Sequence, residues 1–155
     1  MKYWLMKTEP STFGIDDLAR AKDQTTSWEG VRNYQARNML RDDMAVGDLA
    51  LLYHSSCPEP GIAGVMEVVR KGYPDPSAWQ RRGPHFDAKS PEIKPVWYTV
   101  DVRLKERARA VLPLAKLRDH AARELDGLWL LRRGNRLSIT PVDVAHFRFI
   151  RSLLR

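Results

Sequence analysis

The hydrophobic and polar positions along the chain follow two different periods, one typical of strands and one typical of short helices. The run from Leu49 to His54 is almost continuously apolar, as expected for a buried central strand. Val96 to Leu104 instead alternate in polarity, as expected for a half-buried strand. Strand patterns occur in residues 3–7, 49–54, 61–69, 96–104 and 136–140.

Helical spacing predicts four short helices between and after these strands. The first follows Gly14, the second covers about residues 32–41, and the third begins at Pro113. The last helix is predicted to start at Thr140 as N-cap, because Pro141 suits the first helical position. Residues 72–95 are rich in Pro, Asp and Gly and are predicted to form an extended loop.

About five or six strands with short helices at their margins predict an α+β fold with a mixed, barrel-like sheet. We expect a single domain over residues 1–155, because no linker, repeat or low-complexity tract divides the chain. A chain of this length buries enough surface to form its own core.

Composition narrows the class of protein. The formal net charge is +7, which favours a polyanionic partner such as nucleic acid. The single Cys57 cannot form an internal disulfide, and Lys7 interrupts the apolar start before a signal peptide or membrane span could form. We therefore expect a cytoplasmic protein that does not enter a membrane.

The segment from Trp28 to Asn38 has an unusual composition for a surface helix. It combines an indole, a phenol, two guanidinium groups and three carboxamides. Aromatic faces can stack on bases, guanidinium groups fit phosphates, and carboxamides match the edge of a nucleobase. These residues indicate a nucleic-acid recognition surface; the alternative is a structural Trp28 followed by a helix that only caps and packs itself.

Other chemistry has weaker support. His54 and Cys57 form one pair without the second pair of ligands that a tetrahedral metal site needs, so we expect no metal and no cofactor. Gly61 to Gly64 lacks the Lys-Ser/Thr of a phosphate-binding loop. His54 and Ser55 are consecutive on a predicted strand and point to opposite faces, which argues against a base–nucleophile pair.

Several of these motifs occur together in one known family. Taken in order, they closely resemble the EVE-domain family of the PUA-like superfamily, and the resemblance covers nearly the whole chain. Thr8 departs from the family pattern, in which Ser is common before Glu-Pro. The matching segments are Tyr3–Pro10, Trp28–Asn38, Gly47–Asp48, Tyr53–Ser55, Gly61–Gly64, Tyr73–Pro76, Trp97–Tyr98 and Leu130–Ser138.

This resemblance implies a PUA-like mixed β-barrel flanked by helices, related to the YTH, SRA and ASCH domains. It also implies a non-catalytic domain that recognises a modified base, such as 5-methylcytosine, 5-hydroxymethylcytosine or N6-methyladenine, in DNA or RNA. We expect a monomer. The resemblance suggests a base-binding pocket formed by Trp28, Lys7, Thr8, Glu9, Asn33, Tyr53, His54, Ser55 and Leu131, and phosphate contacts by Arg32, Arg37, Arg132 and Arg133. Trp4, Trp97 and Trp129 are expected in the core.

Two alternatives belong to other functional classes. A small nucleoside amidohydrolase of ASCH type would use Lys7 or Glu9 as base and Thr8 as nucleophile. Consecutive side chains on a strand diverge, however, which argues against that arrangement. A protein-interaction module would use the 72–95 loop, although nothing in its composition specifies a partner.

Overall fold

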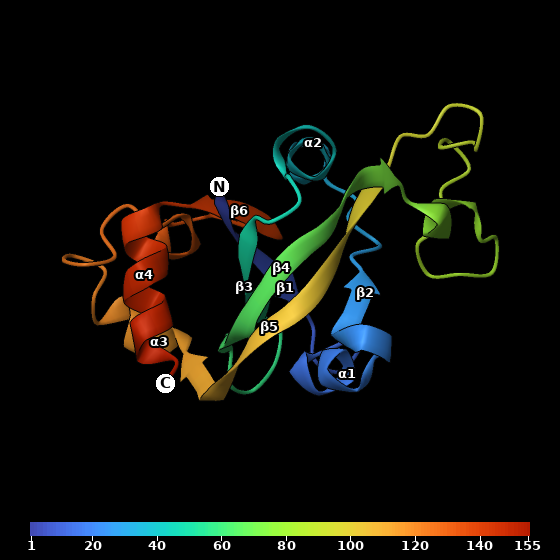
Figure 1. Cartoon of the computed structure of the whole chain (residues 1–155). Helices are drawn as coiled ribbons and strands as arrows, with labels where there is room; N and C mark the ends of the chain where they lie inside the picture. Colours follow the sequence, from blue (N-terminus) through green and yellow to red (C-terminus); the bar gives the residue numbers. More distant parts are fainter.

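The computed structural model describes residues 1–155 and contains one mixed sheet of six strands (Figure 1). The strands are hydrogen-bonded in the order β2-β5-β4-β3-β1-β6. Their bounds are β1 Tyr3–Thr8, β2 Thr25–Ser27, β3 Leu49–His54, β4 Gly61–Pro74, β5 Tyr98–Pro113 and β6 Ile139–Val142.

The sheet is mixed because β1 and β3 run parallel while every other neighbouring pair is antiparallel. The α+β fold is therefore confirmed, but the predicted barrel is an open sheet: β2 and β6 lie at its two ends and do not pair with each other. The long β4 and β5 carry several shifts of register, which let a sheet bend strongly without closing.

The two edge strands of the sheet are short. β2 has three residues, and β6 has four, of which Pro141 lacks an N–H and faces Trp4 of β1. The pairing of β6 with β1 also corrects one prediction. Thr140 lies in β6 opposite Leu5, so the last helix begins after Asp143 rather than after Thr140.

The helices are short and lie around the sheet. The second predicted helix starts later than expected, because the Asn33 side chain caps it by accepting from the Ala36 N–H at 3.0 Å. It continues into a π-helical turn over Met39–Asp43. None of the helices combines the length and apolar character needed to cross a bilayer. Their bounds are α1 Ile15–Arg20, α2 Tyr34–Asn38, α3 Leu114–Arg118 and α4 Val144–Leu153.

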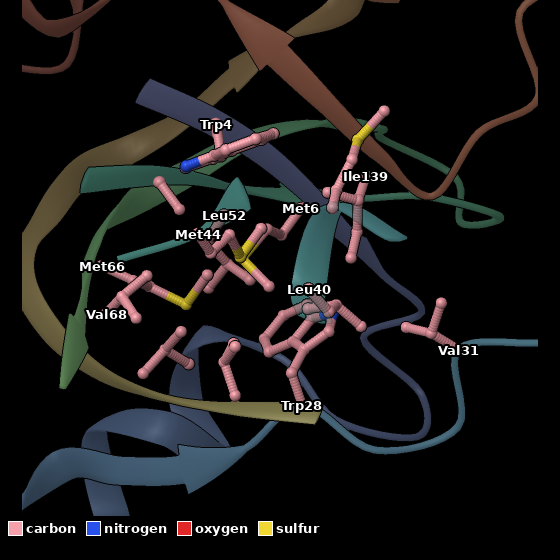
Figure 2. Packing of buried hydrophobic residues seen from close by; sticks show 14 of the residues in the cluster. Trp4, Met6, Trp28, Val31, Leu40, Met44, Leu52, Met66, Val68 and Ile139 are labelled. Atoms are coloured by element: carbon pink, nitrogen blue, oxygen red, sulfur yellow. The ribbon is translucent and has the colours of Figure 1, made fainter. Parts of the chain in front are cut away.

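Two hydrophobic cores lie on opposite faces of the sheet. Alternation along β1 sends Trp4 and Met6 into one core and Leu5 into the other. The first core also contains Trp28 and Leu40 (Figure 2), and we call its side the pocket face. The second core is covered by α3 and α4, and we call its side the α4 face.

Candidate functional site

A hollow in the surface lies where β1 ends, beside the segment that connects β2 to α2. Its volume is about 610 Å³, within the range of about 300–1,000 Å³ that is typical of small-molecule sites. The lining residues are Lys7, Thr8, Glu9, Thr12, Phe13, Thr26, Ser27, Trp28, Glu29, Gly30, Val31, Arg32, His85 and Ser138.

Trp28 belongs both to this pocket and to the core beneath it. Its backbone N–H donates to the Val100 carbonyl at 2.9 Å, which extends the pairing of β2 with β5. The side chain is only 7% exposed and packs in the same cluster as Leu40 and Val31 (Figure 2). The indole is therefore held firmly by packing, and the part that remains accessible forms an apolar surface of the pocket.

The end of β1 supplies the polar side of the pocket. The Lys7 backbone N–H donates to the Ser138 carbonyl at 2.8 Å, which joins the end of β1 to the residue before β6. Burial lowers the pKa of the Lys7 ammonium group below its ordinary value. Glu9, in contrast, is exposed, and its carboxylate makes no hydrogen bond or salt bridge within the protein. Lys7 lines the pocket, but its register partner Tyr53 points to the α4 face, and strand alternation directs the Lys7 side chain the same way. The free charge beside the pocket is therefore the Glu9 carboxylate.

The Thr8 hydroxyl is engaged in a hydrogen bond within the protein. It donates to the Phe13 carbonyl at 2.7 Å, so its proton points at a backbone acceptor and not at a general base. A nucleophilic hydroxyl needs a base within hydrogen-bond reach to take its proton. The geometry therefore provides no activated Thr8 nucleophile of the kind that the amidohydrolase alternative requires.

The opposite wall is formed by Gly30 and His85, which are far apart in the sequence. Gly30 has a φ of +89°, and a Cβ at this position would lie 2.6 Å from the His85 imidazole ring. The ring therefore packs directly on the glycine backbone. The Gly30 N–H also donates to the buried Asp75 carboxylate at 2.9 Å. Only glycine satisfies both the backbone conformation and the close approach of His85.

Arg32, predicted to contact phosphate, donates its hydrogen bonds within this wall. Its guanidinium group donates to Asp75 at 3.0 Å, to Ser77 at 3.3 Å and to the His85 carbonyl at 2.7 Å. The same group lies 5.4 Å from the centre of the Trp97 ring. Because its donors are engaged inside the protein, Arg32 is a structural link rather than a free phosphate ligand.

Asp75 is the acidic centre of that link and is only 1% exposed. Burial alone raises the pKa of its carboxyl group. Hydrogen bonds from the Gly30 N–H, from Ser77 and from Arg32 outweigh that effect and hold the pKa below its ordinary value. The carboxylate is therefore charged at neutral pH and fully partnered.

Three predicted pocket residues at the end of β3 lie outside the pocket. Tyr53 points into the core of the α4 face, because alternation along the strand sends it there. His54 is buried, and its Nε2 atom accepts a hydrogen bond from the Ile15 N–H at 3.1 Å, so it supports the start of α1. Ser55 donates its N–H to the Thr8 carbonyl at 2.8 Å and supports β1 from outside the pocket.

The remaining predicted residues also lie outside this pocket. Asn33 is the cap of α2, and Arg37 donates to the Val96 carbonyl at 3.0 Å. Leu131 packs against the core of the α4 face. Arg132 lies over the Trp129 ring at 4.7 Å, and Arg133 is exposed. Trp4 and Trp97 are buried as expected, whereas Trp129 is only partly buried.

Sequence reasoning missed much of the wall. Thr26, Ser27 and Gly30 lie beside Trp28, and proximity to that residue was the available signal. Ser138 ends the matching segment Leu130–Ser138, which was the available signal for it. His85 carried none, because long-range folding alone brings it to the pocket. No group of three or more His, Cys, Asp or Glu side chains converges in a way that could hold a metal ion.

Comparison with known proteins gives consistent matches over nearly the whole chain. The EVE domain family model matches residues 2–153. Human thymocyte nuclear protein 1 is 42% identical over 165 aligned residues, which cover 97% of this chain and 73% of the human protein.

Solved structures agree with the sequence match. The structure of human THYN1 protein in complex with DNA containing 5-methylcytosine is 40% identical, with a TM-score of 0.94, and the match covers 100% of this chain and 98% of that one. A protein from Pseudomonas putida is 44% identical, with a TM-score of 0.92 and 99% coverage of both chains.

Proposed function

The chain belongs to the EVE domain family, and on that premise we propose that it binds nucleic acid and holds a modified nucleobase in the pocket beside Trp28. One observation carries the proposal. A relative of 40% identity, similar over the full length of this chain, was solved with DNA containing 5-methylcytosine. The chain has a pocket of about 610 Å³ with an aromatic floor and polar walls, which suits a single base.

The lining residues support base recognition chemically. Trp28 and Phe13 offer apolar surface, and stacking on an aromatic side chain contributes about 1–3 kcal/mol per base. The free Glu9 carboxylate is an acceptor for the exocyclic amine of cytosine or adenine. Val31 adds an apolar surface for a methyl group.

A base can enter such a pocket only outside the stack of a duplex. Extrusion from a duplex costs a few kcal/mol, and single-stranded or already unpaired bases cost less. The firmly packed Trp28 compensates in part, because a rigid surface loses little side-chain entropy on binding. We therefore propose that the protein binds an extruded or unpaired base, in DNA or in RNA.

The basic balance of the chain supports attraction to the backbone. With Arg32 engaged inside the protein, Arg132 and Arg133 remain the exposed candidates for phosphate contacts among those expected from the sequence. Arg37 has only part of its guanidinium group free, since it already donates to Val96 and Asn38.

The test is a titration at fixed salt with matched DNA and RNA oligonucleotides that carry cytosine, 5-methylcytosine, 5-hydroxymethylcytosine or N6-methyladenine. We expect tighter binding to one modified oligonucleotide than to its unmodified counterpart. Glu9→Gln should weaken binding about ten-fold or more, because a hydrogen bond to a charged group contributes about 1.5–3 kcal/mol.

Glu59→Gln is the matched control, because this exposed glutamate lies beside α3, changes charge equally and does not line the pocket. It should bind like the wild type. Equal affinity of the wild type for all oligonucleotides would overturn recognition of a modified base. Equal effects of the two glutamate variants would remove Glu9 from the proposed site.

A further inference from the structure

The loop that carries His85 into the pocket also carries four unpaired cations, of which two, Arg81 and Arg82, are adjacent arginines; the others are Lys89 and Lys94. This loop, residues 80–97, connects the short 3-10 helix Pro76–Trp79 to β5 and extends from one side of the molecule (Figure 1). Arg81 and Arg82 are exposed, and neither makes a salt bridge or a side-chain hydrogen bond. Their charges are therefore available to a partner.

The acids of the same loop do not neutralise these arginines. Asp87 accepts from the Trp97 indole N–H at 2.6 Å and from the Lys89 backbone N–H at 2.9 Å. These hydrogen bonds hold the pKa of the Asp87 carboxyl group below its ordinary value, and they direct the carboxylate toward Trp97. Glu92 is the other acid of the loop and has no partner.

The loop is anchored on both sides of the two arginines. Arg32 donates twice to the His85 carbonyl, at 2.7 and 3.3 Å, and the Asp87 N–H donates to the Ala78 carbonyl at 2.9 Å. Two tight turns lie between these anchors, with Gly83 donating to the Gln80 carbonyl at 2.8 Å. The exposed arginines are therefore presented from a fixed base.

The anchors also keep the arginines near the pocket. Arg81 precedes His85 by four positions, and four residues span at most about 15 Å even when fully extended. Along one strand of B-DNA, phosphates recur about every 3.4 Å of the helix axis. A strand whose base occupies the pocket therefore has several phosphates within reach of this loop.

We propose that Arg81 and Arg82 bind the phosphate backbone of the strand whose base occupies the pocket, an inference that rests on the proposed function for the position of that strand. The loop then has two roles: His85 forms the pocket wall, and the two arginines hold the backbone beside it. Arg81 and Arg82 take the place that sequence reasoning gave to Arg32.

The experiment measures affinity for one oligonucleotide, with and without 5-methylcytosine, at several salt concentrations. The test variant is the double substitution Arg81→Gln, Arg82→Gln. The control is Arg118→Gln, Arg148→Gln on α3 and α4, which lie on the other side of the molecule (Figure 1) and lose the same charge. A third variant, Arg81→Lys with Arg82→Lys, retains the charge.

Each phosphate contact contributes about 0.9 to the magnitude of the slope of log affinity against log salt for duplex DNA. The loop variant should reduce that magnitude by about 1.8, for modified and unmodified oligonucleotides alike. The control and the lysine variant should retain the wild-type slope. Equal slopes for the loop variant and the control, or an equal loss in the lysine variant, would overturn the inference.

Failure of the proposed function gives a different result. If the wild type bound modified and unmodified oligonucleotides equally, base recognition would be overturned, while a reduced slope in the loop variant would still support the phosphate contacts. If discrimination persisted and the loop variant matched the control, only the role of the two arginines would be overturned. Absence of any binding by the wild type would overturn both.

Discussion

The two faces of the sheet are equally well buried but are built from different residues and covered by different structures. The core of the pocket face contains two tryptophans and four methionines, and it is covered by short helices and the irregular segment around Trp28. The core of the α4 face contains no methionine or tryptophan among its buried members and is rich in leucine. It is covered by α3, α4 and the chain between them.

The different composition of the two cores indicates which face of the sheet can carry a binding site. Methionine is flexible and fills irregular gaps, so it suits a core that must pack beneath loops and a pocket. Leucines under a regular helix suit a scaffold. Binding sites are commonly carried by loops on a rigid support, and here the α4 face is that support while the pocket face carries the loops.

The largest effects are expected when one large aromatic side chain is truncated on each face of the sheet. Trp28→Ala and Phe147→Ala should each cost about 3–5 kcal/mol of unfolding free energy, because both side chains are buried. Only Trp28→Ala should also abolish discrimination between modified and unmodified oligonucleotides. Chemical denaturation measures the first effect, and titration under conditions where both variants remain folded measures the second.

If folded Phe147→Ala also lost discrimination between modified and unmodified oligonucleotides, base recognition would not be confined to the pocket face. Discrimination that survives in folded Trp28→Ala would show that the indole is only a core residue.

The next largest effect should come from the link between Asp75 and Arg32. Asp75→Ala should cost about 3 kcal/mol, at the low end for breaking a buried ion pair, because the Arg32 side chain remains 24% exposed. It should also weaken binding, since the His85 wall loses its anchor. Glu67→Ala is the control: the salt bridge of Glu67 with Arg103 is more exposed, and its loss should cost less than about 1 kcal/mol. Similar unfolding free energies for both variants would refute the importance of the Asp75 link.

A smaller effect is expected at two glycines with similar backbone conformations. Gly134→Ala should cost about 1–2 kcal/mol, because its φ is +78° and nothing obstructs a Cβ there. Gly30→Ala should cost somewhat more and should also weaken base binding, because the new Cβ displaces His85. The measurement is thermal unfolding together with titration. If both variants bound nucleic acid equally well, the position of His85 would be irrelevant to the site.

The smallest effect concerns pH. Burial lowers the pKa of His54 below 6.5, outweighing the opposite influence of Asp16, and its Nε2 atom accepts from Ile15 only when unprotonated. Below about pH 6.5 the unfolded chain therefore binds a proton that the folded chain resists, and stability falls with falling pH. His54→Gln keeps an acceptor but should lose less stability between pH 7 and 5 than the wild type does. Identical pH profiles in denaturation experiments would contradict this assignment.

Much of the fold was predictable because its strands have clear local patterns, as in the apolar run from Leu49 to His54. The start of the last helix was not. Thr140 and Pro141 form a good local start signal, but pairing with β1 outweighs that preference. The spacing that places Ala36, Met39 and Leu40 inside was correct, because helical periodicity reports burial directly.

The site was harder to predict from the sequence than the fold. Trp28 and the residues from Lys7 to Glu9 do line one pocket, although their roles in binding remain predictions. The contacts of Arg32 inside the protein could not be foreseen, because its main partner, Asp75, is distant in the sequence and belongs to a loop without a regular pattern. Tyr53 was misplaced because family resemblance identifies a motif but does not say which face of a strand each side chain occupies.

The way the two edges of the sheet are built has a consequence for behaviour at high protein concentration. An open sheet exposes unpaired backbone groups that can recruit strands from other molecules and start aggregation. Here β2 covers only Asp101–Arg103, and the edge continues along β5, where Lys105, Arg107 and Arg109 are exposed and the register shifts several times. The other edge contains Pro141, which has no N–H to offer. The fold therefore keeps an open sheet, with room for a pocket beside it, while offering little template for edge-to-edge association.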